Sequence, residues 1–316
     1  MLLHESYLNL LGCLDSSHKL TSTREKSIHK GKELVETINA NATININSIP
    51  VMYSNNEPLL DLNYAASRLV FFLSGSYLER HINNASPGVS FFAENGKISG
   101  SNYGSRILGM NPRQSPIQDI ISLIRSRGMT KRATLSIHDN NDLRHHKSKD
   151  YPCCSSITFI PRAGKLSMHV SMRANNLLKL FQYNIFEFSF LNKIIASNLS
   201  MESEFLFYNC VSLHADSDQV KEYKLSTNLE TRYFSFNENE GISEIQQKCF
   251  DFLCYLQFSY LDGEKKILDK IDDIAKGNKL LILLFYCYYY KVLVVKNMHT
   301  SSSVISKVNE FNEAFQ

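Results

Sequence analysis

Between residues 165 and 195 the sequence changes from the periodicity of a strand to that of a helix. Over residues 166–173 apolar side chains alternate with polar ones, which is the period of a half-buried strand. From Ile185 to Ile195 apolar residues recur at the spacing of a helix with a broad buried face. The sequence therefore predicts a strand that is followed closely by a buried helix.

Three residues near this change carry side chains suited to a binding or catalytic site. Cys153 follows a proline on a predicted loop, Arg173 ends the polar face of the strand, and Asn184 precedes the helix. A thiol can act as a nucleophile, a guanidinium can hold an anion, and an amide can bind an edge that both donates and accepts hydrogen bonds. A turn is predicted at residues 162–164, just before the strand.

Size and composition limit the class of protein. A chain of 316 residues can bury a large core, and we expect one large domain, or one and a half. Its composition, 43% hydrophobic and 21% charged, is that of an ordinary soluble globular protein. The net charge of +3 creates no broad positive field, so no nucleic-acid partner is expected. The apolar segment from Leu280 to Val295 contains Lys291 and is too short to span a bilayer, which predicts a buried helix and no membrane association.

The seven cysteines give no metal-binding pattern. No two of them have CxxC spacing, so neither a zinc site nor another metal is expected. Their number is odd, and residues 1–14 lack the basic start of a secretory signal. These features favour a reducing, cytoplasmic location.

Three short motifs, taken together, resemble those of a known family. They are Pro152-Cys153-Cys154, Arg173-Ala174-Asn175-Asn176 and Gln182-Tyr183-Asn184. Thymidylate synthases and the related pyrimidine nucleotide hydroxymethylases carry Pro-Cys-His, Arg-Ser-x-Asp and Pro-Phe-Asn at the same spacing. A lone cysteine is more often part of a core than a nucleophile, and the shared spacing is what favours the catalytic interpretation. A weaker resemblance extends from about residue 7 to about residue 220.

The resemblance implies an α+β fold in which a mixed β-sheet is flanked by helices. In the family two such sheets stack back to back, so we expect a homodimer or a heterodimer with a homologue. Residues 1–225 would form a nucleotide-binding domain, and residues 226–316 would form a helical C-terminal extension.

The resemblance also assigns catalytic and base-binding residues. Cys153 would add to C6 of a pyrimidine nucleoside monophosphate, which makes C5 ready to accept a methyl or hydroxymethyl group. Arg173 would hold the phosphate and lower the pKa of the thiol. Asn184 would bind the O4 and N3–H edge, which implies uracil because the family uses aspartate there for cytosine. Tyr103, in a Tyr-Gly pair that the family shares, would be catalytic.

Three basic residues match phosphate-binding positions of the family. Lys131 and Arg132 precede a predicted strand at residues 133–137, where family arginines cross the dimer interface to the partner's phosphate. Arg24 matches an arginine on an N-terminal loop, although the family's glycines around it are absent.

A polar pair late in the match corresponds to the family's sugar-binding histidine and tyrosine. His214 matches the histidine, but a one-residue shift would place Leu213 there instead. Asp216 stands where the tyrosine is expected, and its carboxylate can accept a hydrogen bond from a sugar hydroxyl.

Four departures affect the side of the family's site that binds folate. Asn176 replaces the aspartate that binds the pterin, and Leu180 replaces a glycine that makes room for the cofactor. The chain has no tryptophan, and a helical extension stands where the family has a closing C-terminal segment. The resemblance thus implies 5,10-methylenetetrahydrofolate as cofactor, while these positions count against it.

The most serious departure is Arg68, which replaces a glutamate that assists proton movement at the base. A guanidinium cannot act as a base at any ordinary pH. Three hypotheses therefore remain open: a divergent one-carbon transferase, a folate-independent enzyme that uses the same Cys153 adduct, and a catalytically silent nucleotide-binding homologue or partner subunit.

Overall fold

The computed structural model describes most of the chain. The described residues are 1–15, 18–20, 33–111, 115–145, 147–224, 228–236 and 240–315. Arg24, predicted to bind phosphate, lies outside these ranges.

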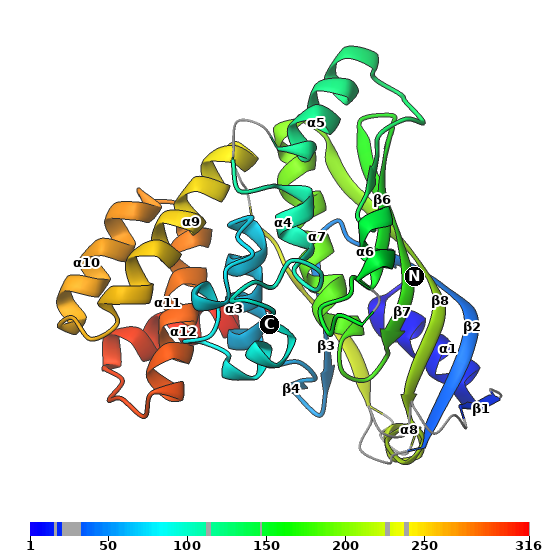
Figure 1. Ribbon diagram of the computed structural model, residues 1–316, viewed down its shortest axis with the longest axis horizontal. Helices are drawn as coiled ribbons and strands as arrows, with labels where there is room; N and C mark the ends of the chain where they lie inside the picture. Colours follow the sequence, from blue (N-terminus) through cyan, green and yellow to red (C-terminus); the bar gives the residue numbers. More distant parts are fainter. Residues whose placement is uncertain are drawn as a thin grey trace.

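A mixed sheet forms one side of the molecule (Figure 1). Among the described residues it has six strands, in the order β1 (His18–Leu20), β2 (Leu34–Asn45), β8 (Glu202–Asp216), β7 (Lys165–Asn176), β6 (Cys154–Arg162) and β5 (Thr134–Ser136). β7 and β8 run parallel, and the other neighbours are antiparallel. The predicted mixed sheet flanked by helices is confirmed.

The hairpin of β6 and β7 forms as the sequence predicts. Ala163 and Gly164 connect the strands with φ angles of 47° and 76°, and positive values at both positions are typical of a two-residue hairpin turn. The predicted apolar face of β7 is fully buried, with no exposed surface at Leu166, Met168, Val170 or Met172. The register of this hairpin places Cys153 close to Arg173.

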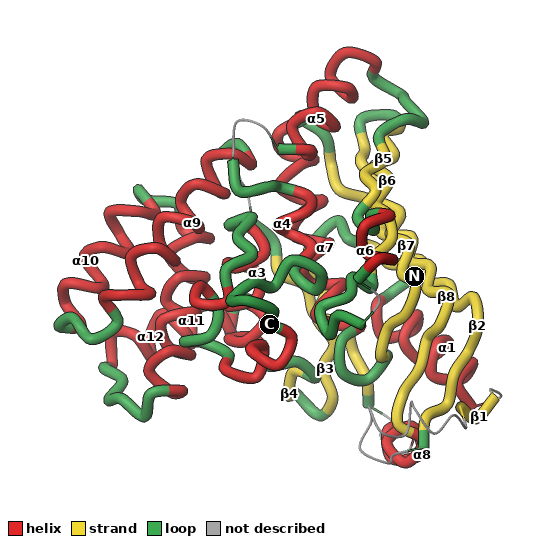
Figure 2. The backbone as a smooth tube through the Cα atoms, viewed as in Figure 1, coloured by secondary structure: helices red, strands yellow, loops and turns green. Residues whose placement is uncertain are grey.

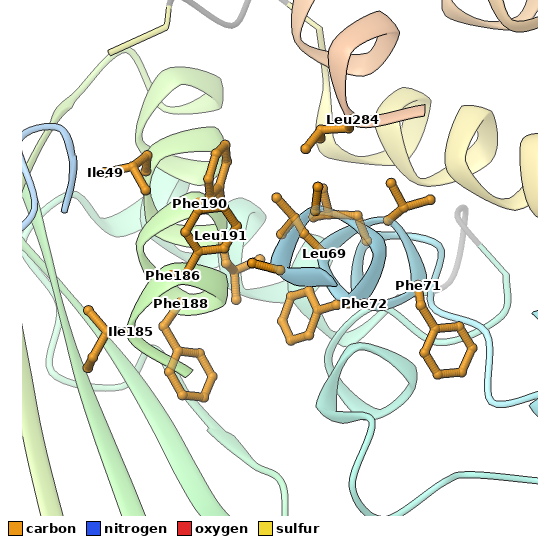
Figure 3. Packing of buried hydrophobic residues seen from close by; sticks show 14 of the residues in the cluster. Ile49, Leu69, Phe71, Phe72, Ile185, Phe186, Phe188, Phe190, Leu191 and Leu284 are labelled. Carbon is orange, nitrogen blue, oxygen red and sulfur yellow. The ribbon is translucent and has the colours of Figure 1, made fainter. Parts of the chain in front are cut away.

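Helix α7 (Phe181–Asn198) separates the sheet from a second layer of helices (Figure 3). Ile185 points toward the strands, whereas Leu191 points toward helix α3 (Leu62–Leu73). A helix that is covered on both sides is apolar around its circumference. The prediction that Asn184 precedes this helix is wrong, because α7 begins at Phe181 and Asn184 lies in its first turn.

A smaller sheet joins the N-terminal half to the region after residue 225. Its described strands are β4 (Glu57–Pro58), β3 (Ile49–Ser54) and β9 (Leu229–Phe234). Residues 41–49 alternate polar and apolar side chains, as one strand would, but they form the end of β2 and the start of β3. The β9 strand was not predicted; it pairs with β3 across a long separation in sequence. The boundary at residue 225 stays a prediction.

The C-terminal helices pack on the side of α3 away from the main sheet (Figures 1 and 2). They are α9 (Ile242–Ser259), α10 (Glu264–Ala275), α11 (Lys279–Val295) and α12 (Ser302–Glu313). Most of α11 is buried, as predicted for this apolar segment. Among the described residues, no helix is long and apolar enough to cross a membrane.

The remaining helices are short, and one of them carries Tyr103. Helix α1 (Leu3–Asp15) packs on β2, α5 (Pro116–Arg127) buries four isoleucines, and the others are α4 (Tyr103–Ile107), α6 (Asn140–Arg144) and α8 (Ser217–Lys224). Short 3-10 helices span Glu79–His81 and Pro87–Phe92. Helix α4 approaches α3 so closely that a Cβ atom on Gly104 would lie 2.0 Å from the carbonyl oxygen of Phe72.

We therefore expect Gly104→Ala to lower stability by about 1–3 kcal/mol, the usual cost of an added methyl group in a packed interior. Thermal unfolding measures this loss. Gly12→Ala is the matched control, because Gly12 lies in α1 with no atom within 4 Å of the added Cβ, and alanine there favours the helix. Equal unfolding temperatures for Gly104→Ala and wild type would contradict the close approach of α4 to α3.

Candidate active site

The structure brings Cys153 and Arg173 together. Cys153 immediately precedes β6, and the Arg173 backbone N–H donates to its carbonyl oxygen at 2.8 Å. The Arg173 Nη2 atom lies 3.6 Å from the Cys153 Sγ, while Nε donates to the Pro152 carbonyl oxygen at 2.7 Å. The ring of Tyr151 lies 4.7 Å from the guanidinium. These contacts fix the cation beside the thiol.

The environment of Cys153 differs from that of its neighbour. Cys154 is fully buried in the core, and burial raises the pKa of its thiol. Cys153 is only partly buried. Burial nevertheless raises the pKa of Cys153, and the positive charge of Arg173 offsets this only in part. The charge of Arg173 lowers the pKa of Cys153, as predicted. The net shift is nevertheless upward, because the effect of burial is larger.

Tyr103 lies at the same place. Its ring stacks on Phe188 of α7, with centroids 6.0 Å apart and an angle of 9° between the planes. Burial raises the pKa of the Tyr103 phenol well above its ordinary value, and negative charge on Cys153 would raise it further. Its hydroxyl is therefore protonated near neutral pH.

A buried ion pair, which the motifs do not predict, joins α3 to α7 beside this tyrosine. Arg68 Nε donates to Glu187 Oε1 at 2.8 Å, and Nη2 donates to Oε2 at 3.1 Å. The two side chains are 19% and 5% exposed. A sequence signal did exist for Arg68, because it is the lone charge within the apolar helix α3 and a buried charge needs a partner.

Asn184 is buried and lies three residues before Glu187, on the same side of α7. Tyr183, the residue before Asn184, places the centroid of its ring 5.3 Å from the guanidinium carbon of Arg68. Its hydroxyl accepts a hydrogen bond from the backbone of Asp61 at 3.1 Å. The first turns of α7 thus carry both the predicted amide and the carboxylate that binds Arg68.

The predicted sugar-binding residues lie together at the ends of β7 and β8. His214 is paired with Asn176 across the two strands. Asp216 is buried, and its carboxylate accepts a hydrogen bond from Lys179 Nζ at 2.9 Å. Lys179, which the motifs do not single out, therefore contacts the carboxylate that was expected to meet a sugar hydroxyl.

Lys131 and Arg132 lie on the segment that leads into edge strand β5. Both are exposed, and within the described ranges neither side chain forms an ion pair. Their positions leave both cations available to a phosphate.

The residues at the folate-side positions do not fit that cofactor. The Asn176 side-chain oxygen accepts the backbone N–H groups of Leu178 and Lys179, at 3.1 and 3.0 Å, and it carries no charge. Leu180 is 42% exposed where the family leaves room for folate. Among the described residues, no group of three or more His, Cys, Asp or Glu side chains is arranged to hold a metal ion.

Comparison with known families agrees with this geometry. The family model described as thymidylate synthase matches residues 14–256, well over half of the chain. The chain belongs to the thymidylate synthase family. The match continues past residue 220, where the motifs fade, into α9. At family level it supports one-carbon transfer to a pyrimidine nucleotide, with 5,10-methylenetetrahydrofolate as the usual cofactor. No curated protein matches the chain.

The raised pKa of Cys153 predicts how its alkylation depends on pH. Because the thiolate is the reactive form, iodoacetamide should modify Cys153 increasingly fast as the pH rises through the raised pKa. Arg173→Gln removes the opposing charge, so alkylation at pH 8 should become slower. Peptide mass spectrometry reads each site, and buried Cys287 reports unfolding. Faster alkylation in Arg173→Gln would contradict the electrostatic role of the arginine.

Proposed function

We propose that this protein is an enzyme that activates C5 of a pyrimidine nucleoside monophosphate for transfer of a one-carbon unit. The observation that carries the proposal is the 3.6 Å contact between the Cys153 sulfur and the Arg173 guanidinium, with Tyr103 close by. Such a contact suits a nucleophile that must meet an anionic substrate.

The covalent step begins with the Cys153 thiolate. Its sulfur forms a bond to C6 of the ring, and the electron pair of the C5–C6 double bond moves through C4 onto O4. The resulting enolate makes C5 nucleophilic. Arg173 favours the thiolate and binds the phosphate, while the buried Asn184 amide binds the O4 and N3–H edge of uracil.

The sugar and phosphate would extend away from this point. We assign His214 and Asp216 to the sugar side, at the ends of β7 and β8. Asp216 also holds Lys179, whose half-exposed ammonium adds positive charge there. Lys131 and Arg132 are assigned to a phosphate, in this subunit or in a partner.

A second candidate function is modification of the nucleotide without folate. It rests on the bonding of the Asn176 oxygen to the backbone and on the position of Leu180. The same Cys153 adduct would then serve a different change at C5.

The outer face of the main sheet supports a homodimer as the working form. Along β8 the residues Phe205, Phe207, Asn209 and Val211 alternate with buried ones and are all at least partly exposed. Phe207 lies beside His169 of β7 and Thr43 of β2, which gives a continuous row across three strands. We infer that a second copy packs on this face.

Exchange of the C5 proton tests the covalent step without a one-carbon donor. Wild type should exchange H5 of uridine or deoxyuridine monophosphate with deuterated solvent, as NMR detects, and Cys153→Ala should abolish this exchange. Thermal shift with the same nucleotides reports whether binding survives. Nucleotide binding without exchange in wild type would favour a catalytically silent homologue and contradict the proposed reaction.

Val211→Asp tests the dimer. Val211 is 51% exposed, so a charge there should leave the folded monomer intact and disrupt an apolar contact between sheets. Light scattering should give a dimer for wild type and a monomer for the variant. Phe258→Asp is the control, because Phe258 is 76% exposed on α9, away from the sheet. A wild-type monomer at micromolar concentration would contradict the proposed assembly.

A further inference from the structure

The buried pair of Arg68 and Glu187 leaves part of the guanidinium unused. Glu187 accepts from Nε and from one Nη2 hydrogen. Among the described residues no side chain or backbone carbonyl accepts from Nη1. The guanidinium carbon lies 5.9 Å from the ring centroid of Tyr64 and 5.3 Å from that of Tyr183. Arg68 is thus held in place on several sides and still has hydrogen-bond donors available.

The pair lies beside Tyr103. The ring of Tyr103 stacks on Phe188, which follows Glu187 on α7, and the charges of Arg68, Glu187 and Cys153 all act on its phenol. Glu187 also lies one turn of α7 from Asn184, the residue assigned to the O4 edge of the base. A base whose O4 contacts Asn184 would therefore lie about one helical turn from the carboxylate that holds Arg68.

Addition of the Cys153 thiolate creates negative charge at O4. We propose that Arg68 donates hydrogen bonds to this enolate oxygen and stabilises it, and that Glu187 positions Arg68 for this purpose. The inference rests on the proposed function and names Arg68 as the group that stabilises the negative charge at O4. A fixed cation directed at developing negative charge in a dry site is an effective form of catalysis.

The step balances without proton transfer at O4. The sulfur–C6 bond forms, and the enolate oxygen holds the negative charge beside the guanidinium until C5 takes a deuteron from solvent water, which leaves hydroxide and returns O4 to a carbonyl. The hydroxide then removes the original C5 proton and restores the enolate, and collapse of the enolate re-forms the C5–C6 double bond and expels the thiolate. Arg68 stays protonated throughout, as a guanidinium does at ordinary pH.

Glu187 is a positioning residue in this account. Its two oxygens bind Arg68 through a bidentate contact, which fixes the plane of the guanidinium. It also compensates the buried positive charge before substrate arrives. Loss of only one partner would leave an uncompensated buried charge and damage the fold.

The test therefore removes both charges together, in Arg68→Gln/Glu187→Gln. We expect kcat for H5 exchange to fall about 100-fold, as when an oxyanion donor is removed. KM for the nucleotide should change less than about threefold, because the contact forms after binding. Arg68→Lys keeps the charge without the planar fork, so it should retain more activity than the double variant. A smaller folded fraction would also lower the apparent kcat at unchanged KM, so the rates are compared per folded protein, with the folded fraction of each variant measured by thermal unfolding.

Lys248→Gln/Glu240→Gln is the matched control. These side chains form another buried ion pair, 8% and 20% exposed, on α9 and the segment before it. Exchange should stay at the wild-type rate there. Wild-type kcat in the Arg68→Gln/Glu187→Gln variant would overturn the role of Arg68 while leaving the Cys153 adduct intact. Absence of exchange in wild type would instead overturn the proposed function, and this inference with it.

Discussion

The ion pair of Arg68 and Glu187 links the two helices on which the site depends. Helix α7 must be apolar on both sides, since it lies between the sheet and α3, yet it carries Glu187 and Asn184 near its start. A charge in such a place is tolerated only when it is paired and hydrogen-bonded. The bidentate contact meets this requirement and fixes α3 against α7. The position of Tyr103 follows, because Tyr103 packs on Phe188 of the same helix.

The C-terminal helices contact α3 on the side away from the main sheet. Helix α11 packs on α3, and Lys291 donates to the Asp61 carboxylate at 2.9 Å. Asp61 is the N-cap of α3, where its other oxygen accepts the Tyr64 backbone N–H. Its own backbone N–H donates to Tyr183 on α7. The extension therefore supports the helix that carries Arg68, which gives it a structural role at the site.

Features governed by local periodicity could be predicted from the sequence. The hairpin turn at Ala163, the buried face of β7 and the burial of α11 follow from alternation, turn chemistry and apolar length. Contacts between distant segments could not, including the pairing of Arg68 with Glu187. The net pKa shift of Cys153 was also missed, because it depends on burial that the sequence does not report. The spacing of the motifs did predict that Cys153 and Arg173 lie together, because the β6–β7 hairpin brings them side by side.

We propose that the Cys153 sulfur forms a covalent bond to C6 of a pyrimidine nucleotide held by the surrounding residues. Incubation with 5-fluorouridine or 5-fluorodeoxyuridine monophosphate, followed by intact-protein and peptide mass spectrometry, detects this bond. We expect a mass increase of one nucleotide, located on the peptide that contains Cys153. A nucleotide that stabilises the protein without any covalent increase, or an adduct on a different cysteine, would contradict it.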